Sequence, residues 1–311
     1  MEIDFIKCQG SGNDFPLIDA RGMRLGDDRW AMLARLLSDR AGPVGGDGLL
    51  LLVGEGRSIG QRMFNPDGSE AETCLNGVRC VARLGFEALG VDSGTLTLKT
   101  SSVDATLVQP IAPGVTTVRT AVGPVSTATR DLGLAAAAEA VIDSTIPGLP
   151  SDRRFTAVAM PNPHLIAFVE EIDEDELIAL GSWCERAPPL IPGRANVSFV
   201  RIDGDALYVR TFERGAGLTD SCGSAMGASI HAAGLSGRVR FGQEISVRNR
   251  GGLVRASASG PQAGSRVVIA GNATFEYDAT VAVDLAAGTI GEPVVRRVRE
   301  DEQAAWASAI G

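Results

Sequence analysis

The sequence predicts an α/β (α+β) protein made of two similar, pseudo-symmetric domains. The chain has 311 residues, which at roughly 150 residues per domain is enough for two. Short β-strand patterns alternate along it with two long helical patterns. Each of these helical patterns starts at a cysteine, Cys74 in the first half of the chain and Cys222 in the second.

Strand signals surround one amphipathic helix at the start of the chain. Strand patterns at residues 3–7 and 15–19 flank a Gly-Ser-Gly-Asn turn at 10–13. Residues 28–38 predict a helix with its large apolar side chains on one face. Two further strands are expected at 49–53 and 62–65.

The first cysteine opens a helix that ends at a glycine. From Cys74 onward, apolar residues recur at helical spacing as far as Leu89. Gly90 can end the helix because glycine readily adopts the left-handed conformation. The strand patterns that follow lie at 96–98, 103–108 and 115–122.

The second half of the chain alternates in the same way. Residues 127–140 are alanine-rich and fit either a helix or an inserted surface segment, whereas 144–153 indicate a loop. A second long helical pattern begins at Cys222, and the charged residues 296–303 indicate a solvated helix or a frayed tail. Strand patterns lie at 165–169, 197–202, 207–212, 245–247 and 267–269.

An internal repeat relates the two halves. An offset of 148 residues places residues 62–65 over 210–213 and Cys74 over Cys222 without a gap. With a slip of one residue, 96–99 then lie over 245–248. The repeat predicts two domains of similar fold with a ligand between them. The expected divisions are an N-terminal domain at 1–120 with a strand near 274–290, a C-terminal domain at 121–273, and a charged tail at 291–311.

Composition excludes several classes of partner. The net charge of −9 argues against a nucleic-acid surface or a basic membrane patch. No signal peptide is visible, and the apolar runs are too short to span a membrane. Five cysteines without a secretion signal indicate a reducing, cytoplasmic setting in which free thiols are functional or buried.

Cysteines at helix starts suit acid–base chemistry. The first turn of a helix carries unpaired N–H groups and a partial positive charge, so it favours a thiolate and can bind a carboxylate. Two such ends could hold one carboxylate between two thiols. One thiolate would remove a proton from one face of a carbon, and the other thiol would return a proton to the opposite face. Cys74 and Cys222 are the candidates for this pair.

The remaining cysteines and the two histidines have simpler interpretations. Cys8, Cys80 and Cys184 are expected to be packed in the interior, as free cysteines usually are. His231 is expected to be packed or on the surface, whereas His164 could line a site. No spacing resembles a zinc site, a dinucleotide-binding fingerprint or a phosphate-binding loop, so we expect no metal and no cofactor.

Several blocks of residues resemble diaminopimelate epimerase, in order from residue 3 to about residue 280. The opening block is Lys-Cys-Gln-Gly-Ser-Gly-Asn-Asp-Phe at 7–15, and Asn-Pro-Asp-Gly-Ser-Glu at 65–70 leads to Cys-Leu-Asn-Gly at 74–77. Glu-Arg-Gly at 213–215 leads to Ser-Cys-Gly-Ser at 221–224. The other matching blocks are Asp-Arg at 39–40, Gly-Asp-Gly at 46–48, Asn-Pro-His at 162–164 and Asn-Val at 196–197.

The resemblance implies a cofactor-independent amino-acid epimerase or racemase. Each of two α/β domains would wrap a sheet around a central helix, and Cys74 and Cys222 would be the acid–base pair. The implied reaction is the conversion of LL- to meso-diaminopimelate in lysine and cell-wall precursor biosynthesis, by a homodimer acting on a small molecule. The implied substrate-binding residues are Leu75, Asn76, Gly223 and Ser224 through their backbone N–H groups, and Asn13, Asn65, Asn162, Asn196, Glu213 and Arg214 through their side chains.

Departures from the family pattern leave the substrate open. Leu75 and Pro161 stand where the family commonly has glycine, and Ala225 and Met226 replace a small pair. Residues 41–43, Ala-Gly-Pro, replace a run that contains an aromatic residue. One alternative is a racemase of the same fold for histidine or hydroxyproline. Others are a non-catalytic amino-acid-binding protein and a thiol redox protein in which the two cysteines cycle as a disulfide.

Overall fold

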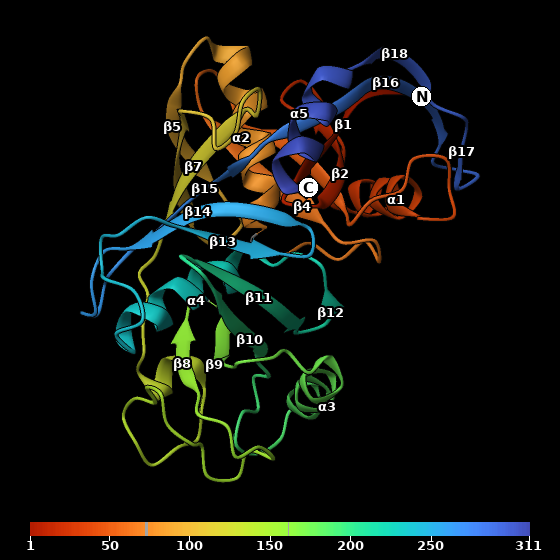
Figure 1. The fold of residues 1–311 in the computed structure, drawn as a ribbon. Helices are drawn as coiled ribbons and strands as arrows, with labels where there is room; N and C mark the ends of the chain where they lie inside the picture. The colour runs from red at the N-terminus through yellow and green to blue at the C-terminus, as the bar shows by residue number, and fades with distance from the viewer. Residues whose placement is uncertain (72–73, 161) are drawn as a thin grey trace. The chain divides into compact units, whose positions relative to one another are not determined.

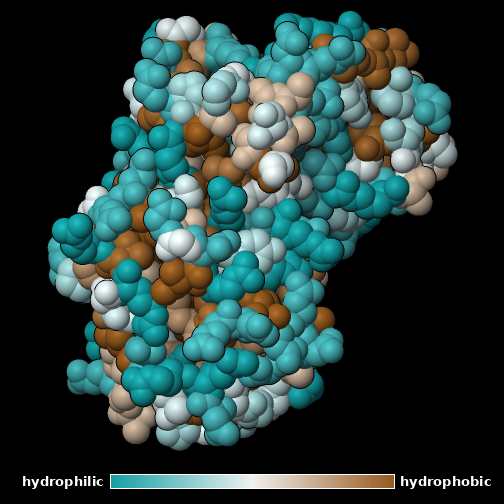
Figure 2. Space-filling view, viewed as in Figure 1, coloured by the Kyte–Doolittle hydropathy of each residue, from teal (hydrophilic) through white to brown (hydrophobic). Residues whose placement is uncertain are grey.

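A computed structural model describes residues 1–71, 74–160 and 162–311 and divides the chain into two compact units (Figure 1). Unit 1 comprises Met1–Thr120 and Ala270–Gly311, and unit 2 comprises Ala121–Ile269. Both units combine β-sheet with a few helices, so the predicted α/β class is confirmed. Polar side chains cover much of the face shown in Figure 2, with small groups of hydrophobic residues between them.

Unit 1 combines a mixed sheet with three helices. Its strands pair in an alternating order: β1 with β2 antiparallel, β2 with β3 parallel, β3 with β4 antiparallel, β4 with β5 parallel, and β5 with β6 antiparallel. Its helices are α1 (Asp27–Ser38), α2 (Leu75–Leu89) and α5 (Glu300–Ile310). Its strands are β1 (Glu2–Gly10), β2 (Asn13–Asp19), β3 (Leu49–Val53), β4 (Ile59–Phe64), β5 (Ser93–Thr97), β6 (Ser102–Val108), β16 (Thr274–Asp284), β17 (Thr289–Ile290) and β18 (Val294–Val298), and β7 (Thr117–Val122) runs from this unit into unit 2.

Strand β3 shows how the sheet is covered on both faces. Its five residues are all apolar, and the first four are fully buried. Leu49 and Leu51 pack in one cluster with Trp30 and Leu33 of α1. Leu50 faces the other way, so that a Cβ at Gly77 of α2 would lie 2.7 Å from its Cδ2. This alternation follows from the two-residue period of a strand.

Helix α2 is the central element of unit 1. Its side chains are buried almost all round, and it contacts each of the strands β1 to β6. It ends at Gly90, whose φ of 65° and ψ of 42° are left-handed and whose N–H donates to the Phe86 carbonyl. The expectation of a helix from Cys74 to Gly90 is therefore confirmed, with Leu75 as the first helical residue.

Unit 2 repeats the pairing order of unit 1. Strands β8 and β9 pair antiparallel, β9 and β10 parallel, β10 and β11 antiparallel, β11 and β13 parallel, and β13 and β14 antiparallel. Helix α4 contacts β8 to β11, β13 and β14, as α2 does its own strands. Its elements are η1 (Thr129–Leu132), β8 (Thr156–Ala159), β9 (Pro163–Phe168), α3 (Glu174–Glu185), β10 (Asn196–Asp203), β11 (Ala206–Glu213), β12 (Gly217–Thr219), α4 (Gly223–Leu235), β13 (Ile245–Asn249) and β14 (Gly252–Ala258), while β15 (Val267–Asn272) runs into unit 1.

The strand register corrects one part of the repeat alignment. Ile59 of β4 pairs with Leu96 of β5, and Leu207 of β11 pairs with Val247 of β13. Ile59 and Leu207 are related by the offset of 148 residues, so the structural equivalent of Leu96 is Val247 rather than Ile245. The connection after the second helix is thus three residues longer, not one.

The structure decides two expectations that the sequence left open and adds one helix. Residues 127–140 contain only the short η1 turn, which ends at Gly133 with a φ of 65°. Helix α3, which the apolar pattern did not indicate, is capped by Asp173 and buries Leu177 and Leu180. Of the residues expected as a solvated helix or a frayed tail, Glu300–Ile310 form helix α5, so the helical alternative is confirmed, while Val294–Val298 form β18, paired with β16.

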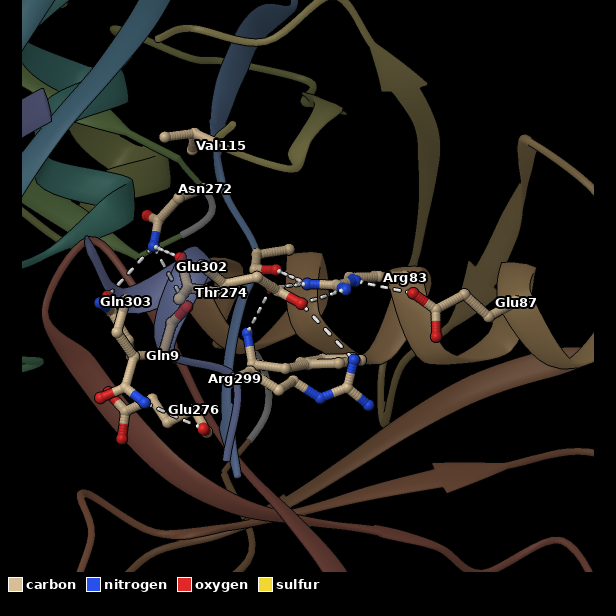
Figure 3. A network of polar contacts seen from close by, with 12 residues as sticks. Gln9, Arg83, Glu87, Val115, Asn272, Thr274, Glu276, Arg299, Glu302 and Gln303 are labelled. Carbon is tan, nitrogen blue, oxygen red and sulfur yellow. Dashed lines mark hydrogen bonds and ion pairs between the residues drawn. The ribbon is translucent and has the colours of Figure 1, made fainter. Parts of the chain in front are cut away.

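Helix α5 is tied to α2 within unit 1 (Figure 3). Glu302 of α5 accepts hydrogen bonds from both terminal nitrogens of Arg83, which lies on α2. The Arg83 guanidinium lies over the ring of Phe275, 3.9 Å from its centroid, and Trp306 of α5 is buried. The last residues therefore belong to the packed body of unit 1, because these partners come from β16 and α2 and are remote in sequence.

Candidate active site

Cys74 caps the N-terminus of α2. Its extended backbone, with φ −133° and ψ 96°, places it just before the first helical residue. Its Sγ accepts a hydrogen bond from the Gly77 N–H at 3.4 Å. The helical ladder begins with the Val78 N–H and the Cys74 carbonyl, so the N–H groups of Leu75 and Asn76 precede it. This is the local geometry that favours a thiolate and a bound carboxylate.

Cys222 occupies the same position on α4. Its φ of −132° and ψ of 106° nearly equal those of Cys74. The ladder of α4 begins with the Met226 N–H and the Cys222 carbonyl, so the N–H groups of Gly223 and Ser224 precede it. The Sγ of Cys222 lies 3.5 Å from the Ser224 Oγ. Each unit therefore presents one thiol and one set of helix-terminal donors.

The environment of Cys222 favours the protonated thiol. Burial raises its pKa well above the ordinary value, and the Glu213 carboxylate raises it further through its charge and a hydrogen bond. The Ser224 hydroxyl and the Ala225 N–H act in the opposite direction but less strongly. Glu213 also accepts a hydrogen bond from the Thr219 Oγ1 at 2.5 Å.

The polar residues predicted in unit 1 lie on two turns. Asn13 begins β2, and its Oδ1 accepts a hydrogen bond from the Asn76 Nδ2 at 2.6 Å. The turn before β2 packs tightly on α2, because a Cβ at Gly10 would lie 2.6 Å from the Asn76 carbonyl oxygen. Asn65 follows β4 and donates to the Ser69 Oγ at 3.0 Å. The structure thus brings Asn13 to the first turn of α2 beside Cys74.

In unit 2, a buried histidine lies between two predicted asparagines. The Nε2 of His164 is 3.0 Å from the Asn162 Oδ1 and 3.4 Å from the Asn196 Nδ2. Burial, with a smaller effect from the Arg214 charge, lowers the pKa of His164 to about 3, so the imidazole is neutral at physiological pH. A neutral ring that donates from Nε2 to the Asn162 oxygen holds that amide in one orientation.

The remaining residues of unit 2 join the same network. The Asn196 Oδ1 accepts the Arg214 N–H at 2.7 Å, and the Asn162 Nδ2 donates to the Ser224 Oγ at 3.4 Å. The Arg214 side chain is exposed, with one hydrogen bond to the Gly193 carbonyl. Its guanidinium has further donors with which to bind a carboxylate.

The predicted residues therefore fall into two sets, one in each unit. Sequence reasoning gave little weight to His164 and did not single out Arg79 or Asp47, which contact predicted residues directly. A signal was available for Arg79, since it is a charged residue within the apolar run Val78 to Ala82.

Three of the departures from the family pattern are buried. Ala225 and Met226 are fully buried in unit 2, and Leu75 is only 6% exposed. Met226 accepts a hydrogen bond at its sulfur from Asn249. Pro161 lies outside the described residues.

The described part of the chain holds neither a metal-binding cluster nor a membrane-spanning helix. Residues 1–71, 74–160 and 162–311 contain no group of three or more His, Cys, Asp or Glu side chains placed to hold a metal ion. No helix among them is long and apolar enough to cross a membrane.

A family model and two relatives similar in sequence carry the same enzyme description. A family model described as diaminopimelate epimerase matches residues 156–276. The chain is 39% identical to the diaminopimelate epimerase of Clostridium acetobutylicum over 289 residues, which cover 91% of this chain and 87% of that protein. It is 35% identical to the diaminopimelate epimerase of Listeria monocytogenes over 293 residues, covering 91% and 89%.

Solved structures share the fold at low identity. A phenazine biosynthesis protein of the PhzF family from Bacillus anthracis superposes with a TM-score of 0.64 and 15% identity, covering 91% of this chain and 100% of that one. A hydroxyproline epimerase from Agrobacterium vitis superposes with a TM-score of 0.61 and 16% identity, covering 93% and 94%. These likenesses establish the architecture.

Proposed function

The chain belongs to the diaminopimelate epimerase family, and we propose that it interconverts LL- and meso-diaminopimelate by inverting one α-carbon with Cys74 and Cys222. The observation that carries the proposal is the equivalence of the two cysteines. Both precede the first turn of a central helix, with backbone angles that agree within about ten degrees. An acid–base pair that works in both directions needs two groups of the same kind in equivalent settings.

In the proposed reaction, one cysteine acts as a base and the other as an acid. The thiolate of one takes the proton from the substrate α-carbon, and the thiol of the other delivers its proton to the opposite face of that carbon. The bond to hydrogen breaks on one side and forms on the other, so no electrons are gained or lost. The raised pKa of Cys222 supports its role as the resting acid. Cys74, next to the Gly77 N–H, is then the resting base.

The helix-terminal donors would stabilise the charge that develops during the reaction. As the α-proton leaves, negative charge spreads onto the neighbouring carboxylate. The N–H groups of Leu75, Asn76, Gly223 and Ser224 precede their helical ladders and can bind those oxygens. This fixed positive field lowers the barrier without a cofactor, and we propose that none is used.

The exposed end of the site supports binding of a second amino-acid group. Arg214 can pair with the distal carboxylate through two parallel hydrogen bonds, and Glu213 can accept from the distal ammonium. We propose that Asn13, Asn65, Asn162 and Asn196 complete these contacts with their amide donors and acceptors. A substrate with two amino-acid ends matches this pattern better than histidine or hydroxyproline does.

We also propose that the protein works in the cytoplasm and as a homodimer. All five cysteines are free thiols, which agrees with a reducing compartment. The dimer rests on the family resemblance and is tested by the mass of the purified protein in solution.

Deuterium incorporation tests the reaction directly. The reduced protein is incubated in D2O with LL- or meso-diaminopimelate, histidine, proline or 4-hydroxyproline. Mass spectrometry then follows deuterium at the α-carbon, and chiral chromatography follows inversion. Exchange with inversion on diaminopimelate alone supports the proposal. Turnover of histidine, proline or 4-hydroxyproline, with no turnover of diaminopimelate, would assign that amino acid as the substrate instead. Binding of an amino acid without deuterium exchange would indicate a non-catalytic protein.

A further inference from the structure

Arg79 is a fully buried cation one turn into the helix that Cys74 begins. Its Nη2 donates to the Ser11 Oγ at 2.9 Å and to the Asn76 Oδ1 at 3.0 Å, and its Nε donates to the Asn272 carbonyl at 3.0 Å. Asn272 is itself held by Gln9 and Thr274, as Figure 3 shows. The interior therefore fixes the guanidinium from three directions.

Arg79 can only donate hydrogen bonds. A guanidinium has five N–H groups and no acceptor. Burial lowers the pKa of Arg79 to about 10, which leaves it protonated at neutral pH. The atom of Asn76 that faces it must therefore be the amide oxygen, because the amide nitrogen would set donor against donor.

A line of hydrogen bonds runs from Arg79 through two asparagines to Asp47. The Asn76 Nδ2 donates to the Asn13 Oδ1 at 2.6 Å, and the Asn13 Nδ2 donates to the Asp47 Oδ2 at 3.0 Å. Asp47 is held at the far end by Arg40, whose Nη2 lies 2.6 Å from its other oxygen. An ionised carboxylate only accepts hydrogen bonds. The line thus begins at a group that can only donate and ends at one that can only accept.

This arrangement leaves one direction for both amides. A reversed Asn76 would place its nitrogen against Arg79, and a reversed Asn13 would place its oxygen against the Asp47 carboxylate. Reversal of one amide alone would also create a mismatch between the two. Each mismatch leaves a polar group unpaired, which is most unfavourable at Asn76 because its side chain is buried. At Asp47, whose side chain is 37% exposed, water reduces the cost.

We propose that Arg79 and Asp47 are positioning residues that together set the direction of the Asn13 amide, Arg79 acting through the buried Asn76 amide, and so decide which side of Asn13 offers the substrate a donor and which an acceptor. The inference rests on the proposed function, in which the Asn13 side chain binds the substrate and Asn76 contributes its backbone N–H. Neither Arg79 nor Asp47 needs to touch the substrate to act in this way.

The line of hydrogen bonds makes a specific prediction, because either Arg79 or Asp47 alone is sufficient to direct both amides. With Arg79 replaced by glutamine, which can donate or accept, Asp47 still directs Asn13 and through it Asn76. With Asp47 replaced by asparagine, Arg79 still directs Asn76 and through it Asn13. Only the double variant Arg79→Gln with Asp47→Asn frees both amides. The two substitutions should therefore be strongly coupled although two residues stand between them.

The experiment is a double-mutant cycle on kcat/KM, measured by the deuterium assay with diaminopimelate. The double variant is expected to lose about 10- to 100-fold more than the product of the two single losses. The matched control is Arg79→Lys with Asp47→Asn, because lysine also only donates, and its losses should multiply without excess. Melting temperatures should change additively in both cycles. Multiplicative losses in the glutamine cycle, or an equal excess in the lysine cycle, would overturn the proposal.

A second measurement keeps the inference testable if Arg79→Gln fails to fold. In wild-type protein labelled with nitrogen-15 at asparagine, the Asn76 side-chain NH2 should show stronger cross-peaks to Asn13 than to the Arg79 guanidinium. The opposite pattern would contradict the inference. A wild-type protein that exchanges no deuterium on any substrate would instead contradict the proposed function, and the labelling experiment would still report the amide directions.

Discussion

The carboxylate of Glu213 acts directly on the thiol of Cys222, through a hydrogen bond and a repulsive charge that both favour the protonated sulfur. Cys74 has a different neighbour, since its sulfur accepts a hydrogen bond from the backbone N–H of Gly77. The two cysteines therefore share a backbone position but rest in different protonation environments.

Removing the charge of Glu213 should make Cys222 easier to deprotonate. In Glu213→Gln, the repulsion of the thiolate is lost while burial is unchanged, so the pKa of Cys222 falls. At a mildly alkaline pH, alkylation of Cys222 should become faster, by up to about tenfold for each unit by which the pKa falls. Peptide mapping by mass spectrometry after a short iodoacetamide pulse measures this rate across pH. Glu185→Gln, a second carboxylate of unit 2, should leave it unchanged, and a slower reaction in Glu213→Gln would contradict the assignment.

Loss of either cysteine should abolish inversion. Cys74→Ala and Cys222→Ala should each lower kcat by at least about 10²- to 10⁴-fold, the usual contribution of a general acid or base. The matched control is Cys184→Ala, because Cys184 is buried in unit 2 and its pKa is raised by burial to about 12. Inversion near the wild-type rate in either active-site variant would rule out the two-cysteine mechanism.

The buried histidine makes stability depend on pH. The pKa of His164 is lowered to about 3 in the folded protein, against about 6.5 when unfolded. Its contribution to stability is therefore present above about pH 6.5 and is lost as the pH falls towards 3, because the unfolded chain takes up the proton first. Between neutral pH and about pH 5, this amounts to about 2 kcal/mol.

Urea unfolding of wild type and His164→Gln at the two pH values measures this effect. The variant should lose less stability on acidification than the wild type. His231, whose pKa burial lowers to about 4, should account for part of what remains. An unchanged pH dependence in His164→Gln would show that the ring is not held neutral.

Helix α5 should stabilise unit 1 through Glu302. In Glu302→Gln the buried Arg83 keeps Glu87 but loses its second charged partner, and the hydrogen bonds to residue 302 weaken, which should lower the free energy of unfolding by about 1–3 kcal/mol. Glu300→Gln, at an exposed position at the start of the same helix, should change it by less than about 0.5 kcal/mol. Chemical denaturation compares the two, and equal effects would mean that the Arg83 pair contributes nothing beyond surface charge.

Sequence alone predicted the elements whose causes are local. The helix from Cys74 to Gly90 has apolar spacing and a glycine stop within its own residues, and the strand at 49–53 matches its apolar run. Helix α3 was missed because its apolar stripe is weak. Its other signals are Asp173 as the N-cap and three acidic residues in the first turn. Its position depends on contacts far away in the chain, such as Gly181 against the ring of Phe212.

For the candidate site, the sequence predicted which residues belong to it but not how their side chains are oriented. The cysteines and asparagines stand out as blocks along the sequence. The directions of the amides cannot be predicted from the sequence. They depend on contacts that Asn13 and Asp47, from distant parts of the chain, make with the first turns of α2 only in the folded protein. Likewise, the register that relates Leu96 to Val247 is set by pairing between strands and is invisible to a residue-by-residue offset.

At the positions of the two cysteines, the residue that would best stabilise the helix differs from the residue that the proposed reaction needs. An N-cap is best filled by serine, threonine, aspartate or asparagine, whose oxygen satisfies a helix-terminal N–H. The chain instead uses sulfur at the start of each central helix, where an oxygen would bond more strongly but could not exchange a proton near neutral pH. If the proposed function holds, the sequence that would fold most stably differs from the working sequence at Cys74 and Cys222. Selection for thermal stability alone would then favour replacing the two proposed catalytic residues.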